Sequence, residues 1–322
     1  MTTTSVRSSS VLGTMSTGRK LKNGAMGVLI YAAFGLALIP LIWLSVTVID
    51  RGIDRFMIMP DGSTGLNFEF LQQSMRGVYG GAIQGGILHA IWGTLIITGL
   101  ATLISVPIGL LTAIYLVEYG KGRLKRMVTF FVDVMTGIPS IVAGLFAYAL
   151  FAIVFGAGTK NGFTGAVALS VLMIPVVVRS SEEMLRLVPN ELREASYALG
   201  VPKYLTVIKV VVRTAIAGIT TGVTLAIARV IGETAPLLVA VGSIDSMNFN
   251  PVEGRMMTLP VYIVSEWRKG TAVCSDAADT SCLVEITEYR AWAAALVLIL
   301  IVMALNLAAR LISRYFSPKT GR

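Results

Sequence analysis

An arginine and a glutamate stand four residues apart inside an apolar stretch of this chain. Arg229 and Glu233 lie in a predicted helical run, 214–241, where the spacing i, i+4 places two side chains on one helix face, within reach of an ion pair. An arginine at the centre of a membrane helix costs about 2.5–3.5 kcal/mol on the insertion scale. We therefore expect Arg229 to have a partner or a wet cavity. A guanidinium released from its carboxylate can hold an oxyanion through two parallel hydrogen bonds.

Small residues precede this charged pair at four-residue spacing. They are Gly218, Gly222 and Ala226, and such spacing is typical of close contacts between membrane helices. The spacing predicts that the charged pair continues this buried seam and does not face lipid. Pro236 cannot donate to the carbonyl four residues earlier, so we expect a kink there. The combination suits a moving transport pathway or, alternatively, a bridge that locks two helices.

Few other residues offer catalytic chemistry. His89 is the single histidine, and we predict that it is an interfacial residue at the mouth of a span. No paired catalytic carboxylates, metal-ligand cluster or Ser/His pair is apparent, so neither a metal site nor a membrane-embedded enzyme is favoured, and no cofactor is expected. Cys274 and Cys282 lie in one loop, where a disulfide and two free thiols both remain open. The chain contains no G-x-x-x-x-G-K-[ST] string for binding ATP.

The composition predicts an all-α integral membrane protein. The chain has 322 residues, of which 55% are hydrophobic and 14% charged, whereas soluble domains carry about 25% charged residues. Its mean hydropathy is +0.76. We predict a flexible N-terminal tail (1–25), a six-helix domain (26–315) and a short C-terminal tail (316–322). Runs of roughly 20 apolar residues, long enough to cross a bilayer as helices, lie near 26–49, 88–117, 128–155, 162–178, 214–241 and 291–312.

The basic residues predict the orientation. Cytoplasmic loops of membrane proteins carry an excess of Lys and Arg. Residues 50–87 contain three basic and four acidic residues, and residues 242–290 contain four basic and seven acidic residues. Both loops are therefore predicted to be external, and both termini and the connection 179–213 cytoplasmic. The net charge of +9 follows mostly from this asymmetry and does not call for a nucleic-acid partner.

A short amphipathic helix is predicted within the connection 179–213. This connection holds ten charged residues in 35 positions, so it lies outside the lipid. Asn190 is a good N-cap, and Glu191 adds an acidic residue to the first turn. Gly200 suits the left-handed position that ends a helix, and Pro202 prevents its continuation. The helix has about ten residues and is too short to be stable alone.

This helix must pack against something. Leu192, Ala195 and Leu199 form a narrow apolar stripe, with Arg193 and Glu194 turned away from it. The protein's own membrane helices, the lipid headgroups and a separate partner all remain open as the surface that the stripe contacts.

The same segment resembles the EAA motif of ABC-importer permeases, whose loop docks into a groove on the cytoplasmic ATP-binding subunit. Glu194-Ala195-Ser196 is followed after three residues by Gly200. The sequence departs from the motif where Ser196 replaces an alanine and Arg213 stands in place of the usual proline. The resemblance implies that the 190–202 helix couples this chain to an ATPase, with four coupling residues: Glu191, Glu194, Ala195 and Gly200.

A second resemblance is more specific. Residues 228–238 read Ala-Arg-Val-Ile-Gly-Glu-Thr-Ala-Pro-Leu-Leu, which is similar to the signature of phosphate-importer permeases of the PstA type. Residues 136–142 and 179–189 also match, and the resemblance covers about residues 26–315. It implies a type I ABC importer permease (MetI-like) fold and a non-catalytic subunit whose substrate pathway includes Arg229, Glu233 and Thr234.

The resemblance also implies partners. These are a homologous PstC-type permease, a PstB-type ATPase dimer, a PstS-type periplasmic phosphate-binding protein and inorganic phosphate, in the bacterial plasma (inner) membrane. The external loops 50–87 and 242–290 are plausible docking surfaces for the binding protein. Two alternatives remain: a permease for another oxyanion, such as sulfate or molybdate, and an ion-coupled transporter, which internal inverted repeats would favour.

Overall fold

The computed structural model describes residues 17–274 and 281–316, with side chains up to residue 311. The chain divides into two compact units, residues 1–50 and 51–322. The described part is helical apart from short irregular segments and two isolated β-bridges, Ile58–Thr64 and Ala82–Cys282. Most of each predicted terminal tail, residues 1–16 and 317–322, lies outside the described residues.

Helix α1 (Thr17–Asp54) is the main element of the first unit. It begins within the predicted N-terminal tail, so residues 17–25 are helical. Its most apolar window has a mean hydropathy of 2.3, and its large apolar side chains are exposed. A helix that is apolar all round needs lipid or protein on every side.

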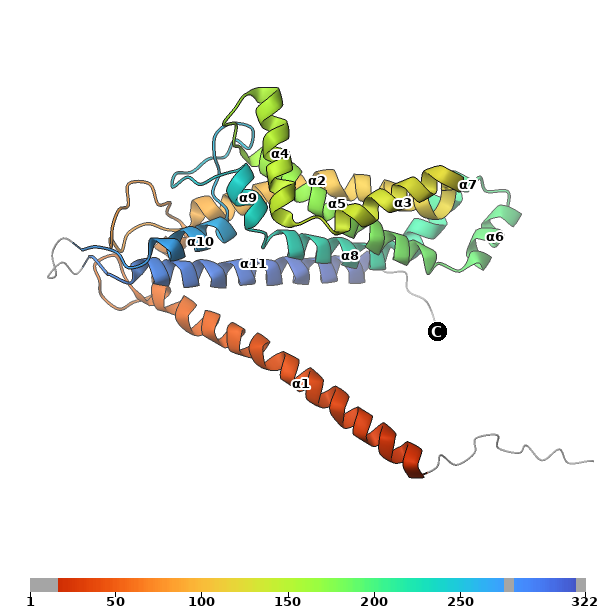
Figure 1. Cartoon of the computed structure of the whole chain (residues 1–322), viewed down its shortest axis with the longest axis horizontal. Helices are drawn as coiled ribbons and strands as arrows, with labels where there is room; N and C mark the ends of the chain where they lie inside the picture. The colour runs from red at the N-terminus through yellow and green to blue at the C-terminus, as the bar shows by residue number, and fades with distance from the viewer. Residues whose placement is uncertain (1–16, 275–280, 317–322) are drawn as a thin grey trace, which may run out of the picture. The chain divides into compact units, whose positions relative to one another are not determined.

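Four long helices form the frame of the second unit (Figure 1). Helix α5 packs against α2 and α8, and α11 packs against α8. These helices correspond to four of the predicted spans. Their bounds are α2 (Leu88–Ile114), α5 (Gly162–Arg186), α8 (Arg213–Val230) and α11 (Ile286–Phe316).

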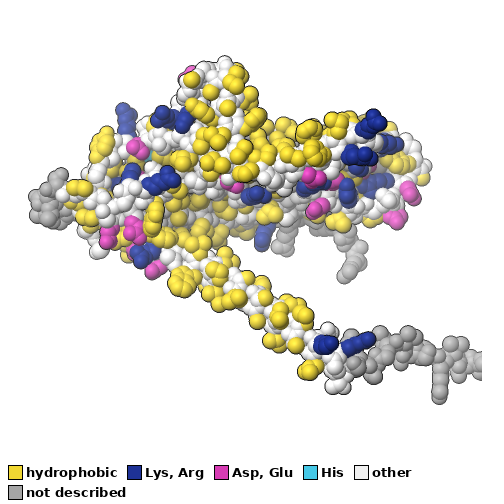
Figure 2. Space-filling view, in the orientation of Figure 1, with side chains coloured by type: hydrophobic (Ala, Val, Ile, Leu, Met, Phe, Trp, Pro, Cys, Tyr) yellow, Lys and Arg dark blue, Asp and Glu magenta, His cyan; other side chains and the backbone are white. Residues whose placement is uncertain are grey.

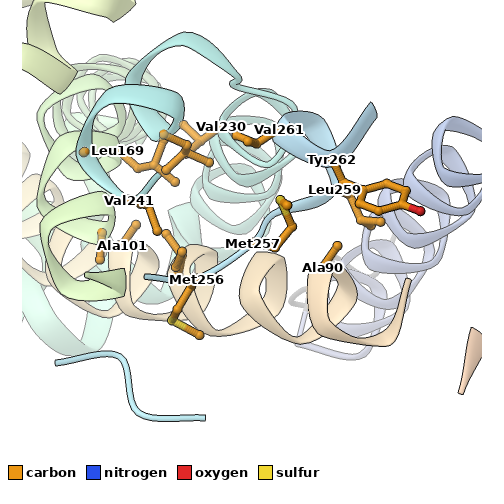
Figure 3. Packing of buried hydrophobic residues seen from close by; sticks show 14 of the residues in the cluster. Ala90, Ala101, Leu169, Val230, Val241, Met256, Met257, Leu259, Val261 and Tyr262 are labelled. Atoms are coloured by element: carbon orange, nitrogen blue, oxygen red, sulfur yellow. The ribbon is translucent and has the colours of Figure 1, made fainter. Parts of the chain in front are cut away.

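The largest core cluster lies where α2, α5, α8 and the segment 241–262 meet (Figure 3). Ala90 and Leu169 are fully buried there, and Val230 is 1% exposed. Close approach of α2 to the segment requires a glycine, because a Cβ on Gly93 would lie 1.9 Å from the carbonyl oxygen of Met257. Van der Waals packing of this kind holds membrane helices together where lipid gives no hydrophobic driving force.

The third predicted span, 128–155, is not one straight helix. Helices α3 (Gly122–Thr136) and α4 (Ser140–Phe155) meet at 108°. Pro139 has no backbone N–H and disfavours the helical conformation of the preceding residue, which explains the break. Within residues 17–274 and 281–316, five helices are long and apolar enough to cross a membrane, and up to six spans result if this bent pair counts as one.

The membrane helices extend further into the connection 179–213 than the sequence predicted. Helix α5 continues past residue 178 because its charged residues pair: buried Glu182 accepts hydrogen bonds from Arg179 at 2.8 Å and from Arg186 at 2.5 Å. Arg179 also pairs with Asp133 of α3. The fifth span begins at Lys203, with α7 (Lys203–Thr206) followed by a π-helical stretch, Val207–Val212.

Charged side chains gather around the end of the second unit that carries α3, α6 and α7, whereas the middle of the bundle is largely apolar on the face shown in Figure 2. Here α6 is the helix Asn190–Ala198. This distribution agrees with a bundle whose middle lies in lipid and whose end lies in water.

The predicted external loop 242–290 contains a helix, α10 (Leu259–Lys269), which packs against α11. Leu259 and Tyr262 are at most 1% exposed. The middle of this segment is therefore part of the core.

Candidate functional site

Arg229 lies in the last turn of α8, and its side chain is exposed. The helix ends at Val230, and Glu233 lies half-buried in the turn that precedes α9 (Ala235–Ala240). Thr234 stands directly before α9 and is also half-buried. Three residues that the sequence assigned to a substrate pathway are thus brought together at one break in the fifth span.

Arg229 and Glu233 do not form the predicted ion pair. Because α8 stops before Glu233, the spacing i, i+4 does not place Arg229 and Glu233 on one helix face. The described residues contain no ion pair between them, and none gives the Arg229 guanidinium a hydrogen-bond partner. Pro236 lies in the first turn of α9. The expected kink is therefore a full interruption between two helices.

The small-residue seam is present, but it does not lead to Arg229. A Cβ on Gly222 would lie 2.5 Å from Oγ of Ser180, and one on Gly218 would lie 2.3 Å from Sδ of Met184, so α8 contacts α5 closely. The buried row continues to Val230. Arg229 comes directly before Val230 and is exposed, so the contact with α5 does not bury it.

Helix α4 packs against α9, the helix that follows the interruption. A Cβ on Gly144 would lie 2.5 Å from Cα of Pro236, so α4 and α9 are in direct contact at a position that only glycine fits. The bend after α3 directs α4 toward α9 (Figure 1). Two proline-dependent breaks, at residues 137–139 and 231–234, therefore position the segment that carries Glu233.

Helix α6 corresponds to the predicted coupling helix and ends as predicted. Gly200 has φ +73°, its N–H donates to the carbonyl of Tyr197 at 2.9 Å, and the N–H of Val201 donates to the carbonyl of Ser196 at 3.2 Å. This is the bonding pattern of a Schellman motif. The predicted start is off by one residue, because Asn190 is the first helical residue and no side chain caps the helix.

The surface of α6 is uncovered in this chain. Glu191, Glu194 and Ala195 are exposed, and of the apolar stripe Leu199 is 83% exposed. The described helices of the second unit therefore leave this stripe uncovered. Ser196 faces inward, where its hydroxyl lies 2.8 Å from the hydroxyl of Thr206 in α7.

Arg193 makes contacts that the sequence did not predict. Its guanidinium contacts Oε1 of Glu118 through Nε at 3.0 Å and Nη2 at 2.9 Å. It also donates to the carbonyls of Leu185 at 3.1 Å and Val188 at 2.6 Å. The orientation away from the stripe was predicted, but no local pattern identifies a partner 75 residues earlier in the chain.

At the predicted external end, Cys274 and Cys282 form a disulfide, which resolves the alternative that the sequence left open. A Cβ on Gly81 would lie 2.6 Å from Sγ of Cys282, so the disulfide packs directly on the segment before α2. His89 lies in the first turn of α2, where it is 3% exposed and its ring contacts that of Tyr262 edge-on, with the ring centres 5.6 Å apart.

Two buried arginines lie near this disulfide. Arg290 donates to the carbonyls of Ala82 and Gln84 and lies 3.7 Å from buried Glu266. Arg55 donates to the carbonyl of Ile83 at 2.7 Å. These bonds fix the segment 82–85 that leads into α2.

Comparison with known proteins adds independent information on the family. Residues 105–322 match the family model "Binding-protein-dependent transport system inner membrane component". A curated relative, "Phosphate transport system permease protein PstA 1" of Mycobacterium tuberculosis (strain ATCC 25618 / H37Rv), is 45% identical over 94% of this chain and 91% of its own length. The PstA protein of Pasteurella multocida (strain Pm70) is 39% identical over 91% of this chain and 95% of its own length.

Solved structures share the fold. A chain of the inward-facing MetNI methionine ABC transporter aligns with a TM-score of 0.56 at 20% identity, covering 72% of this chain and 96% of that one. A chain of a bacterial alginate ABC transporter, solved with an alginate-bound periplasmic protein, aligns with a TM-score of 0.61 at 11% identity, covering 94% and 97%. At these identities the likeness establishes the fold alone, which is that of ABC importer permeases.

Proposed function

The chain belongs to the family of PstA phosphate transport permeases, and on this premise we propose that it is a membrane-spanning subunit of an ATP-driven importer of inorganic phosphate. The observation that carries the proposal is the 45% identity to a PstA relative over 94% of the chain. The subunit itself is not an enzyme. ATP is hydrolysed on a partner, in keeping with a sequence that has no phosphate-binding loop of the P-loop kind.

The proposed pathway runs along the uncovered side of α8, between this chain and a homologous PstC-type permease. Arg229 is exposed there, at the end of an apolar helix. A charged side chain is costly in lipid and is tolerated beside a water-filled passage or a partner. A polar passage between two subunits is the environment that suits this residue.

The residues at the break have the chemistry that phosphate requires. A phosphate group carries about −1.5 to −2 charges near pH 7. Arg229 supplies a positive group that can donate two parallel hydrogen bonds to its oxygens. Glu233 accepts a hydrogen bond from a protonated phosphate oxygen and keeps the arginine from holding the anion too tightly, while Thr234 adds a hydroxyl.

In this proposed complex, the ATPase acts on this chain at α6. Its uncovered residues Glu191, Glu194 and Ala195, together with Gly200 in the Schellman turn, dock on one subunit of a PstB-type ATPase dimer. A PstS-type periplasmic binding protein delivers phosphate from the opposite side. The assembly lies in the bacterial inner membrane, with both termini of this chain in the cytoplasm, as the positive-inside rule requires.

Uptake of labelled phosphate by proteoliposomes that contain the assembled complex tests the proposal. Both Arg229→Gln and Glu233→Gln remove a charge; the second keeps the side-chain size, and the first shortens the side chain. We expect Arg229→Gln to lower uptake about tenfold or more, since a hydrogen bond to a charged group contributes about 1.5–3 kcal/mol. Arg126→Gln, which removes an exposed arginine of α3, is the matched control and should transport normally.

Three other outcomes would each contradict one part of the proposal. Wild-type uptake by both pathway variants would remove Arg229 and Glu233 from the pathway. Competition by sulfate or molybdate that is as strong as competition by unlabelled phosphate would indicate a permease for another oxyanion. Uptake that persists without ATP would indicate an ion-coupled transporter.

A further inference from the structure

The contact between Arg193 and Glu118 joins the coupling helix to a helix far from it in sequence. Only 13% of the Arg193 side chain and 6% of the Glu118 side chain are exposed. Removing one partner of a buried ion pair is strongly destabilising, because the other charge remains buried without compensation. The pair is therefore a firm connection, unlike most exposed ion pairs, which contribute at most about 1 kcal/mol.

Glu118 belongs to a π-helical stretch, Tyr115–Tyr119, that continues α2. A residue that follows α6 in the chain also contacts this stretch. Lys203, at the start of α7, donates to the backbone carbonyl of Glu118, and its ammonium lies 4.7 Å from the ring centre of Tyr119. The end of α2 is thus bonded both to α6 and to the segment that follows it.

Arg193 also bonds to the end of α5. Its donors reach the carbonyl of Leu185 in the last turn of α5 and that of Val188 just beyond it. Both residues are buried, and carbonyls at a helix end lack a partner inside the helix. One guanidinium therefore connects α6 to both α2 and α5. The rest of α6 is largely uncovered, and Ser196 provides its contact to α7.

We propose that Arg193 is a positioning residue that transmits movement of the coupling helix directly to α2 and α5. Along the backbone alone, a push on α6 would reach α8 through residues 199–212. Through Arg193 the same push also moves α2, which packs against α5. This inference rests on the proposed function only in taking α6 as the place where an ATPase acts.

Hydrogen exchange of the backbone amides of residues 115–121, measured in the assembled complex with and without bound nucleotide, tests the transmission. We expect a nucleotide-dependent change in exchange at 115–121 in the wild type and its loss in Arg193→Ala, with the ATPase still bound. Arg126→Ala is the control and should retain the change. An unaltered change in Arg193→Ala, or no change in the wild type, would overturn the inference whatever the transported ion is.

A double-mutant cycle with Arg193→Ala and Glu118→Ala provides a second test. The measured quantity is the number of phosphate ions taken up per ATP hydrolysed, which a loss of folded protein alone does not alter. We expect Arg193→Ala to lower this ratio about fivefold or more, the lower end of coupling between sites in proteins. The double variant should be no worse than Arg193→Ala, because the two residues act through one contact.

Additive effects of the two substitutions, or an unchanged ratio, would contradict a shared route through this pair. A wild-type complex that takes up no phosphate would instead count against the proposed function, while the exchange measurement would still decide the role of Arg193.

Discussion

The guanidinium of Arg229 is exposed, because the described part of the chain does not cover it. The sequence placed this arginine and Glu233 in the same short segment, and the structure keeps them there. What the spacing could not give was their relative orientation, because i, i+4 geometry holds only while the helix continues. The interruption after Val230 precedes Pro236, which packs against Gly144 of α4, and local sequence does not contain that contact.

A second arginine has the opposite environment and gives a prediction about stability. Arg290 is 1% exposed and faces Glu266, which is also buried. Arg290→Ala leaves Glu266 with Lys269 as its one ion-pair partner among the described residues, and it removes the donor to the carbonyls of Ala82 and Gln84. We expect a loss of about 3–5 kcal/mol, measured as a lower midpoint of thermal unfolding in detergent. Arg51→Ala removes an exposed ion pair with Glu288 and should change stability by less than about 1 kcal/mol.

Tyr262 gives a prediction about pH. Burial raises the pKa of the Tyr262 hydroxyl above its ordinary value, and the Glu266 carboxylate raises it further. The unfolded chain therefore loses this proton first as the pH rises above about 10, so the free energy of unfolding falls in that range. Tyr262→Phe should reduce the alkaline loss and cost little at pH 7.5, because the hydroxyl has no hydrogen-bond partner among the described residues.

The measurement is the unfolding midpoint at pH 7.5 and at pH 10.5. Tyr79→Phe, at a tyrosine that is 84% exposed, should keep the alkaline loss of the wild type. An equal alkaline loss in Tyr262→Phe would show that another group is responsible.

Among the helices, the long apolar runs were predicted well and the breaks were not. Runs near 88–117 and 291–312 correspond to α2 and α11, because twenty apolar residues in lipid have no alternative to a helix. The run 128–155 was equally apolar, yet Pro139 divides it. The end of α5 was missed because the ten charged residues of 179–213 predicted a connection outside the lipid. Glu182 instead pairs with Arg179 and Arg186 within the helix, at spacings i, i+3 and i, i+4.

The seam between α5 and α8 gives a prediction at the same scale. Gly222→Leu would drive a side chain into Ser180, where even a Cβ would lie 2.5 Å from Oγ. We expect α8 to separate from α5, with a loss of about 1–3 kcal/mol or more from overpacking, seen as a lower unfolding midpoint. Gly99→Leu, at a glycine of α2 with no atom within 4 Å of a Cβ, should be tolerated. Equal effects of the two substitutions would mean that helix propensity, and not the seam, sets the cost.

At the scale of the whole molecule, a substitution in the uncovered stripe of α6 tests whether the ATPase partner binds there. Leu199→Asp places a charge on a side chain that is 83% exposed, so we expect the permease to fold normally and to lose its ATPase partner during purification. Val273→Asp changes a residue of similar exposure, 82%, on the side predicted to be external, and should retain the ATPase. Retention by both variants would place the ATPase contact elsewhere.

The exposed Arg229 and Leu199 also have a consequence for the life of the protein in the cell. A newly made chain without partners carries one charge at the edge of its membrane helices and one apolar stripe in water. Both are features that quality-control proteases and chaperones act on, because they mark incomplete burial. Synthesis of this subunit in excess should therefore yield short-lived protein, and its cellular abundance should follow the supply of the subunits that cover it.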